Sequence, residues 1–217
     1  MSSIKLKHSG GNAVSLHPPT SAPSASDVQF KLPTSDGSAG QVLQTDGSGN
    51  LSWVTLPTSG LAMADQWRIH SNFSVPVNQN TYITSNWERN DSAGFGLLGS
   101  GMSESSGEFT FPSTGIYLVQ FHTECYFSTN TNPRLMSRIY VTTDNSNYSY
   151  VSLGTLHAKD GGYYASGDTS AQVDVTNTST HKVKFLYYHT GASGGATITG
   201  DSSGNETHVT FLKLGET

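Results

Sequence analysis

The longest regular pattern in the chain is an alternation of apolar and polar residues over residues 115–127. An alternation with a period of two is typical of a half-buried β-strand, with one face in a core and the other in water. The inward face would carry Tyr117, Val119, Phe121, Cys125 and Phe127, and the outward face Gln120, His122 and Glu124. The segment before it, residues 107–115, predicts the end of one strand and a turn that contains Pro112.

Shorter patterns of the same kind follow one another through the rest of the chain, at the spacing of a β-sandwich. The expected strands lie near residues 67–75, 80–87, 108–111, 115–127, 135–143, 148–156, 171–176, 182–189, 196–199 and 207–214. The last of these stops three residues before the end of the sequence.

Two of these strands carry large side chains on both faces. In residues 182–189, Val183, Phe185 and Tyr187 alternate with Lys184, Leu186 and Tyr188, and Tyr140 lies on a similar strand. A second layer over such a sheet is expected, either a neighbouring subunit or an overlying loop. Tyr140, Leu186 and Tyr188 are therefore candidates for trimer or core packing.

Residues 1–60 show no long strand pattern. A Ser-Gly-Gly-Asn turn separates two short apolar pieces and predicts a hairpin at residues 4–16, followed by an extended linker over residues 18–26. Two further turn-and-strand units follow, and each alone would bury too little to be stable. Three copies wound about one axis could bury Val42, Leu43, Leu51 and Trp53. Residues 61–66 read as a helical turn or a stiff linker, and residues 67–217 as the head.

The composition narrows the class of function. Charged residues are 12% of the chain and the net charge is −5, against about 25% charged residues in an average soluble domain. The basic residues are scattered, which excludes nucleic acid as the expected partner. The sequence predicts neither membrane insertion nor a secretory signal. The single cysteine, Cys125, is expected to be a buried, inert thiol.

The motifs that resemble catalytic or cofactor sites are weak, and no cofactor is expected. Residues 94–99 match G-x-G-x-x-G and residues 191–195 match G-x-S-x-G, but both motifs require a helix that the surrounding Gly and Ser residues disfavour. His122 and Glu124 share one strand face. They form either a weak metal-binding pair or a hydrogen-bonded structural pair.

Two segments rich in tyrosine are the candidate ligand-binding loops. One is residues 160–168, and the other follows the turn at residues 144–147. Tyrosines beside carboxylates can stack on sugars and hydrogen-bond to them, or can serve any protein-recognition surface. Alternatively, they cap the core or fill a trimer contact. The candidate residues are Tyr148, Tyr150, Asp160, Tyr163, Tyr164 and Asp168.

Two stretches resemble known families. The pattern G-x-F-x-x-P-x-x-G-x-Y from Gly107 to Tyr117 resembles the signature of C1q/TNF-like domains. The string from Gly40 to Trp53, G-Q-V-L-Q-T-D-G-S-G-N-L-S-W, resembles the N-terminal segment of fibre and appendage proteins of tailed bacteriophages, marine ones in particular. These resemblances imply a jelly-roll head that assembles as a homotrimer and binds ligands without transforming them, carried by an N-terminal virion-attachment segment.

The sequence therefore predicts an all-β virion protein, a trimeric tail fibre or spike whose head binds a host surface glycan or protein. Residues 1–60 would attach it to tail, baseplate or capsid proteins, and it would be made in the host cytoplasm and exposed on the particle. One alternative is a capsid decoration or head-fibre protein anchored by the same segment. A second alternative is a glycan depolymerase, which requires paired carboxylates about 5–10 Å apart in a groove.

Overall fold

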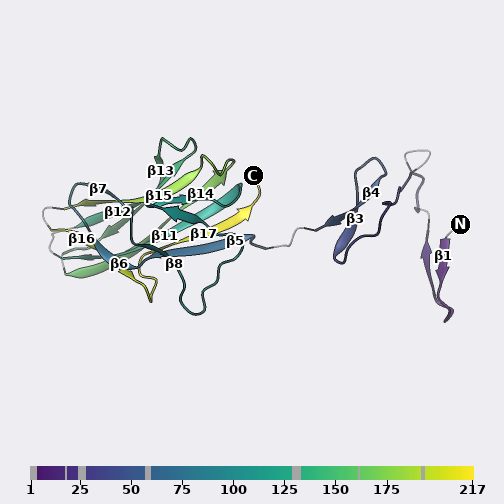
Figure 1. Cartoon of the computed structure of the whole chain (residues 1–217), viewed down its shortest axis with the longest axis horizontal. Coiled ribbons are helices and arrows are strands. Elements are labelled where there is room, and N and C mark those ends of the chain that lie inside the picture. Colours follow the sequence, from purple (N-terminus) through teal and green to yellow (C-terminus); the bar gives the residue numbers. More distant parts are fainter. Residues whose placement is uncertain are drawn as a thin grey trace. The chain divides into compact units, whose positions relative to one another are not determined.

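The computed structural model describes residues 4–17, 19–23, 28–56, 60–128, 133–160, 162–191 and 194–217. These residues form seventeen β-strands and no helix (Figure 1), so the all-β class is confirmed. No helix that could span a membrane occurs in these ranges. The chain separates into two compact units, residues 1–58 and residues 59–217, called below the N-terminal unit and the head.

The N-terminal unit contains two hairpins. In the first, β1 (Ile4–Lys7) pairs with β2 (Ala13–Leu16), as the turn between them predicts. In the second, β3 (Gln41–Thr45) pairs with β4 (Leu51–Thr55). The expected linker over residues 18–26 lies partly outside the described residues.

The turn of the second hairpin is closed by one carboxylate. Asp46 accepts hydrogen bonds from the backbone amides of Ser48, at 2.8 Å, and of Asn50, at 3.1 Å. Asp and Asn favour such turns because their side chains can satisfy backbone donors two to four residues ahead. The side-chain hydrogen bond from Asn50, together with these amides, holds the pKa of Asp46 below its usual value.

Residues 31–38 lie along this hairpin. The indole Nε1 of Trp53 donates to the carbonyl oxygen of Ser35 at 3.0 Å, and a Cβ atom at Gly37 would fall 2.5 Å from the Trp53 ring. Only glycine fits at this position, because any side chain would displace the indole. Trp53 therefore holds the segment and the hairpin together.

The head is built from two antiparallel sheets. The first sheet has the order β13-β12-β15-β10-β9, with β7 also pairing with β15. Its strands are β7 (Asn80–Tyr82), β9 (Ser103–Ser105), β10 (Glu108–Thr110), β12 (Arg134–Thr142), β13 (Ser149–His157) and β15 (Lys182–Thr190).

The second sheet has the order β6-β16-β11-β17-β5-β8, with β14 pairing along the other side of β11. Its strands are β5 (Met63–Ile69), β6 (Ser71–Val75), β8 (Trp87–Arg89), β11 (Gly115–Phe127), β14 (Tyr163–Val175), β16 (Ala196–Asp201) and β17 (His208–Gly215).

The chain crosses repeatedly between the two sheets. From β11 in the second sheet it passes to β12 and β13 in the first, then to β14 in the second, to β15 in the first, and to β16 and β17 in the second. Alternation of this kind is the Greek-key connectivity of a jelly roll. The predicted jelly-roll sandwich is confirmed.

Aromatic rings from both sheets fill the space between them. The ring centroids of Phe121 and Phe185 are 4.6 Å apart, and those of Trp87 and Phe109 are 5.1 Å apart in an edge-to-face contact. All five residues predicted on the inward face of β11 are buried. Among them is Cys125, and burial raises the pKa of its thiol to about 12, which makes it a poor nucleophile at neutral pH.

The structure gives physical reasons for the motif between Gly107 and Tyr117. Ser106 and Gly107 have φ values of 53° and 82°, and positive φ at both central residues is typical of the two-residue turn that joins β9 to β10. The hydroxyl of Tyr117 donates to the carbonyl oxygen of Ser113 at 3.0 Å. It thereby closes the turn around Pro112.

The structure differs from the sequence predictions at four points in the head. The helical turn or stiff linker expected at residues 61–66 is wrong from Met63 onward, where β5 begins. The expected strand at 67–75 is interrupted at His70, and that at 80–87 is divided between β7 and β8. The short strand β9 was not expected. The alternation of apolar and polar residues is broken in β5, because the inward-facing Asp65 is buried and pairs with Arg89 at 3.1 Å.

The expected loop over residues 160–168 is also wrong. β14 already begins at Tyr163 and runs for 13 residues. By its pairing with β11, the inward positions after Tyr163 are Ala165, Gly167 and Thr169, which are small or polar. The first half of β14 therefore lacks the large apolar residues that would have marked the strand.

Candidate functional site

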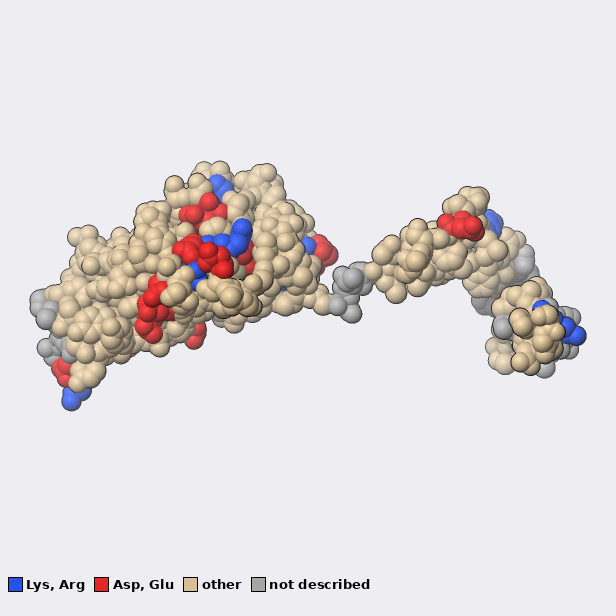
Figure 2. All heavy atoms as spheres, turned by 60° about the horizontal axis from the view of Figure 1, so that its bottom comes forward, with Lys and Arg blue, Asp and Glu red and all other residues tan. Residues whose placement is uncertain are grey.

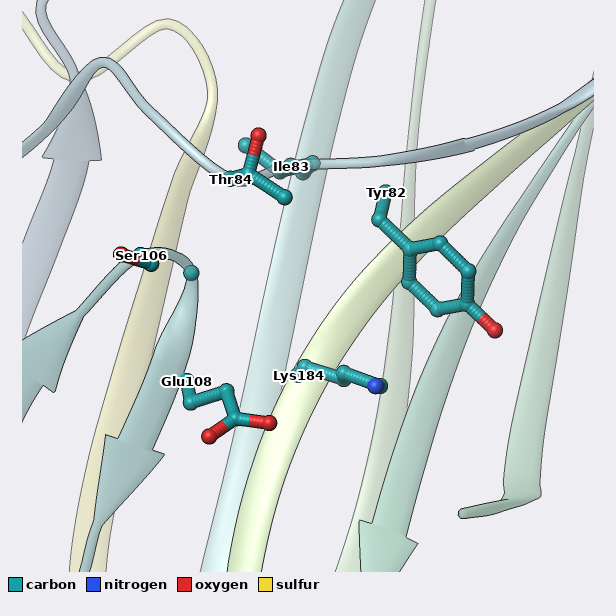
Figure 3. A pocket seen from close by; sticks show the side chains of 7 residues that line it. Tyr82, Ile83, Thr84, Ser106, Glu108 and Lys184 are labelled. Carbon is teal, nitrogen blue, oxygen red and sulfur yellow. The ribbon is translucent and has the colours of Figure 1, made fainter.

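A pocket of about 280 Å³ opens on the head where two short strands meet. β7 and β10 pair with different parts of β15, β7 at Leu186–Tyr188 and β10 at Lys182–Val183. The pocket lies between them. Its lining residues are Tyr82, Ile83, Thr84, Ser106, Gly107, Glu108 and Lys184 (Figure 3).

The backbone around the pocket is fixed by two close approaches. The amide of Ile83 donates to the carbonyl oxygen of Phe185 at 3.1 Å, which extends the pairing of β7. Gly107 packs so closely against Ile83 that a Cβ atom would overlap the Ile83 carbonyl. The turn and the end of β7 therefore form a close-packed wall, and glycine is required for both its φ and its contact.

The charged groups of the pocket come from neighbouring strands. Lys184 Nζ lies 3.5 Å from the ring centroid of Tyr148 and 4.7 Å from that of Tyr82. Glu108 accepts a hydrogen bond from the Tyr148 hydroxyl at 2.8 Å and one from Lys182 at 3.4 Å. The bond from Tyr148 and the nearby lysines lower the pKa of Glu108. Glu108 is therefore ionised at neutral pH.

A row of tyrosines continues from the pocket across the outward face of the first sheet. The ring of Tyr140 lies 5.9 Å from that of Tyr82 and 6.0 Å from that of Tyr150. Arg138 lies over the rings of Tyr150 and Tyr188, at 5.6 and 5.5 Å. Since cations attract aromatic faces, these contacts order the row.

Leu186 belongs to the same face and is fully buried within one chain. By register it is paired with Arg138 of β12 and Tyr82 of β7. Its burial therefore does not require a second subunit. Tyr140 and Tyr188 are half-buried, and their role in trimer packing stays a prediction.

A second pocket, of about 360 Å³, lies at the start of β14. Its lining residues are His157, Ala158, Lys159, Asp160, Tyr163 and Tyr164. Tyr163 and Tyr164 are 60% and 67% exposed. Three of the predicted ligand-binding residues, Asp160, Tyr163 and Tyr164, are thus brought together here.

Asp168 lies elsewhere, on the outward face of the second sheet. Its carboxylate is 2.8 Å from Nδ1 of His122, whose ring stacks on that of His208 at 5.1 Å. Glu124, the other member of the weak metal-binding pair, accepts a hydrogen bond from Thr199 at 3.2 Å. Within the described ranges, no three His, Cys, Asp or Glu side chains are grouped as metal ligands.

The six predicted ligand-binding residues therefore occupy three places. Tyr150 belongs to the tyrosine row of the first sheet, and Tyr148 borders the first pocket through Glu108 and Lys184. Sequence reasoning missed Tyr82, Glu108 and Lys184 as binding candidates. One available signal was the polar alternation of Lys182 and Lys184 with buried Val183 and Phe185, which places both lysines on the outward face.

Little of the visible surface is charged. Figure 2 shows a few clusters in which acidic and basic atoms occur together, while most of that face carries neither. The binding chemistry available there is mainly that of hydroxyls, amides and aromatic rings.

The sequence matches no protein-family model and no curated protein. Murine APRIL at pH 5.0 is similar in structure, with 12% identity and a TM-score of 0.48 over 70% of this chain and 98% of that chain. The Eiger TNF of S. frugiperda has 11% identity and a TM-score of 0.47 over 73% and 96%. The PRD1 vertex protein P5 has 16% identity and a TM-score of 0.44 over 72% and 99%. Values this low assign no function.

Proposed function

We propose that the chain is a bacteriophage virion protein, a trimeric fibre or spike whose head binds the host cell surface without chemical transformation. The observation that carries the proposal is the unequal burial of apolar side chains in the two units. The head buries its apolar faces within one chain, whereas the N-terminal unit leaves most of its large apolar side chains exposed. The fibre-like string from Gly40 to Trp53 supports the same reading.

The exposed side chains of the N-terminal unit suit an anchor. They are Ile4, Leu6, Leu16, Val28, Phe30, Leu32, Val42, Leu43, Trp53 and Leu56. Contact with further copies of the chain or with virion proteins would remove this area from water, at about 25 cal/mol per Å². The anchor therefore gains stability from assembly.

The register of the second hairpin refines the proposed trimer contact. Leu43 is the cross-strand partner of Trp53, and Val42 is the partner of Val54. Neighbouring residues of a strand point to opposite faces, so one axial contact cannot cover Val42, Leu43, Leu51 and Trp53 together. Leu51 shares the face of Trp53 and Leu43.

A trimeric head would act by multivalency. Three identical sites on one axis, repeated on several fibres, raise avidity without tight single contacts. The carboxylates support binding over hydrolysis, because the pocket at Glu108 and the pocket at Asp160 each contain a single carboxylate. Glycoside hydrolysis by the usual route requires two.

The native mass of the full chain and of residues 59–217, measured by light scattering, tests the assembly. A full chain near three times 23.1 kDa is expected. A monomeric full chain at all concentrations would contradict the proposed trimer.

Location and adhesion are tested on particles. Antibodies against the head, viewed by electron microscopy, are expected to label the tail, and purified head added first is expected to slow adsorption to host cells. Label confined to the capsid would favour the decoration alternative. Absence from purified particles would overturn the proposal.

A further inference from the structure

The pocket lined by Tyr82, Glu108 and Lys184 contains the ammonium group of Lys184, whose N–H groups can donate hydrogen bonds to a ligand. Lys184 lies between the rings of Tyr82 and Tyr148, and among the described residues no oxygen accepts a hydrogen bond from its ammonium group. An ammonium group has three N–H donors. A ligand that enters the pocket can therefore supply the oxygen acceptors that the protein leaves open.

Glu108 supplies the complementary acceptor. One carboxylate oxygen of Glu108 accepts a hydrogen bond from Tyr148, and the other accepts one from Lys182. Because a carboxylate can accept about four hydrogen bonds, it has capacity left for a ligand. The group is ionised, so a hydrogen bond from a ligand hydroxyl would be charge-assisted and stronger than a neutral one. Figure 3 shows that the side chains of Glu108 and Lys184 both line the pocket, with Lys184 directed toward Tyr82.

Tyr82 adds an apolar surface beside these two groups. Tyr82 is 41% exposed, and its ring is supported by an edge-to-face contact with Tyr140. Thr84 and Ser106 line the opposite part of the pocket (Figure 3). Because the turn at Gly107 is packed against Ile83, these groups are held on a preorganised backbone, which lowers the entropic cost of binding.

We propose that this pocket binds one neutral pyranose unit of a surface glycan, with adjacent hydroxyls between Lys184 and Glu108 and its C–H face on Tyr82. The inference rests on the proposed adhesive function and names its ligand class. A pocket of about 280 Å³ is at the lower end of small-molecule sites, which span about 300–1,000 Å³. The lining contains one carboxylate, Glu108, and one ammonium group, Lys184, so its charges balance and it suits an uncharged sugar better than an acidic one.

The test is saturation-transfer NMR on the full chain, with methyl glucoside, galactoside and mannoside as neutral probes and methyl glucuronide as the acidic match of the glucoside. At least one neutral probe is expected to bind weakly. Tyr82→Ala and Glu108→Gln should each weaken that binding about tenfold, or about 1.4 kcal/mol. Tyr82→Phe retains the ring and should retain binding. Phe95→Ala, which removes an exposed ring outside both pockets, is the matched control and should change nothing. Tyr163→Ala tests the second pocket as a competing site.

Three outcomes would overturn the inference: no binding of any neutral probe, tighter binding of the glucuronide than of the glucoside, or loss of binding in Tyr163→Ala but not in Tyr82→Ala. Gln has nearly the same shape as Glu, so Glu108→Gln is expected to fold. It therefore still tests the pocket if Tyr82→Ala does not fold. If Tyr82→Ala still blocks phage adsorption as well as the wild type, the sugar pocket is wrong and the adhesive function stands. If the wild-type chain neither blocks adsorption nor occurs on particles, the adhesive function itself is wrong.

Discussion

The head and the N-terminal unit use the same element, the antiparallel strand, but differ in what covers it. In the head, two sheets bury each other's apolar faces, and Phe109, Phe121, Phe185 and Phe211 are wholly inaccessible. In the N-terminal unit each hairpin has only two strands, and its apolar residues remain exposed. An isolated two-stranded hairpin is marginal in water. The comparison indicates that the core of the head is complete within one chain, whereas the N-terminal unit leaves most of its large apolar side chains uncovered.

The largest expected effect comes from removing the last strand of the head. β17 pairs with both β5 and β11 and contributes Val209 and Phe211 to the core. A chain that ends at Glu206 would leave the second sheet divided and the core open. We expect it to lose cooperative thermal unfolding and its near-ultraviolet circular dichroism.

The matched control removes the other unit. A chain of residues 59–217 should unfold at the same temperature as the head in the full protein, because no core residue of the head lies before Met63. Cooperative unfolding of the chain that ends at Glu206 would contradict the reading of β17 as a core strand.

The next largest effect is expected from opening a cavity in the head. Phe185 is buried between Phe121, Phe109 and Trp87. Phe185→Ala should lower the free energy of unfolding by about 3–5 kcal/mol, measured from denaturant midpoints. Tyr163→Ala, which removes an exposed ring from the same unit, should change it by less than about 0.5 kcal/mol. Equal losses in the two variants would show that this core is not the source of the head's stability.

The alternation of apolar and polar residues predicted the strands of the head whose inward residues are large and apolar. It failed for strands whose inward residues are small or polar. β11, β12 and β15 were found because rows of Phe, Tyr, Val, Ile and Leu mark their inward faces. The first half of β14 was missed because its inward residues Ala165, Gly167 and Thr169 are small or polar. The start of β5 was missed because Asp65 is buried there and pairs with Arg89. These exceptions depend on partners distant in sequence.

The two candidate pockets differ in how far the sequence could predict them, again because of contacts between residues distant in sequence. Asp160, Tyr163 and Tyr164 were found because the second pocket is local in sequence. Tyr82, Glu108 and Lys184 come from three separate segments, which meet only through the register of β7 and β10 on β15. The sequence of any one of these segments does not predict how the strands align with one another.

A smaller effect is expected in the N-terminal unit, at the contact between Gly37 and Trp53. Gly37→Ala places a Cβ atom within 2.5 Å of the indole, and such overpacking costs about 1–3 kcal/mol. In an NMR spectrum of the indole N–H groups, the Trp53 signal should shift as its bond to Ser35 breaks. The signals of Trp67 and Trp87, both in the head, should stay in place.

Gly204→Ala is the control for this variant, since a Cβ atom there meets nothing within 4 Å. It should leave all three indole signals unchanged. Movement of the Trp67 and Trp87 signals in Gly37→Ala would contradict the independence of the two units.

The smallest effect is a pH dependence confined to the head. Burial, and then the neighbouring His122, lower the pKa of His208, while Asp168 acts in the opposite direction. A lowered pKa favours the neutral imidazole in the folded state. Its stabilising contribution is therefore complete above the unfolded pKa of about 6.5 and is lost as the pH falls towards the lower folded value.

Melting temperatures at pH 7.5, 6.5 and 5.5 test this dependence. The wild type should lose stability below about pH 6.5, and His208→Gln should lose less over the same range. Some dependence should remain in the variant, because burial also lowers the pKa of His189. Residues 59–217 should follow the full chain, since His189 and His208 both lie in the head. If His208→Gln leaves the change of melting temperature with pH unaltered, the titrating group lies outside the stacked pair of His122 and His208. If the pH dependence disappears when residues 1–58 are removed, it belongs to the N-terminal unit, and the contrast between the two units is weakened.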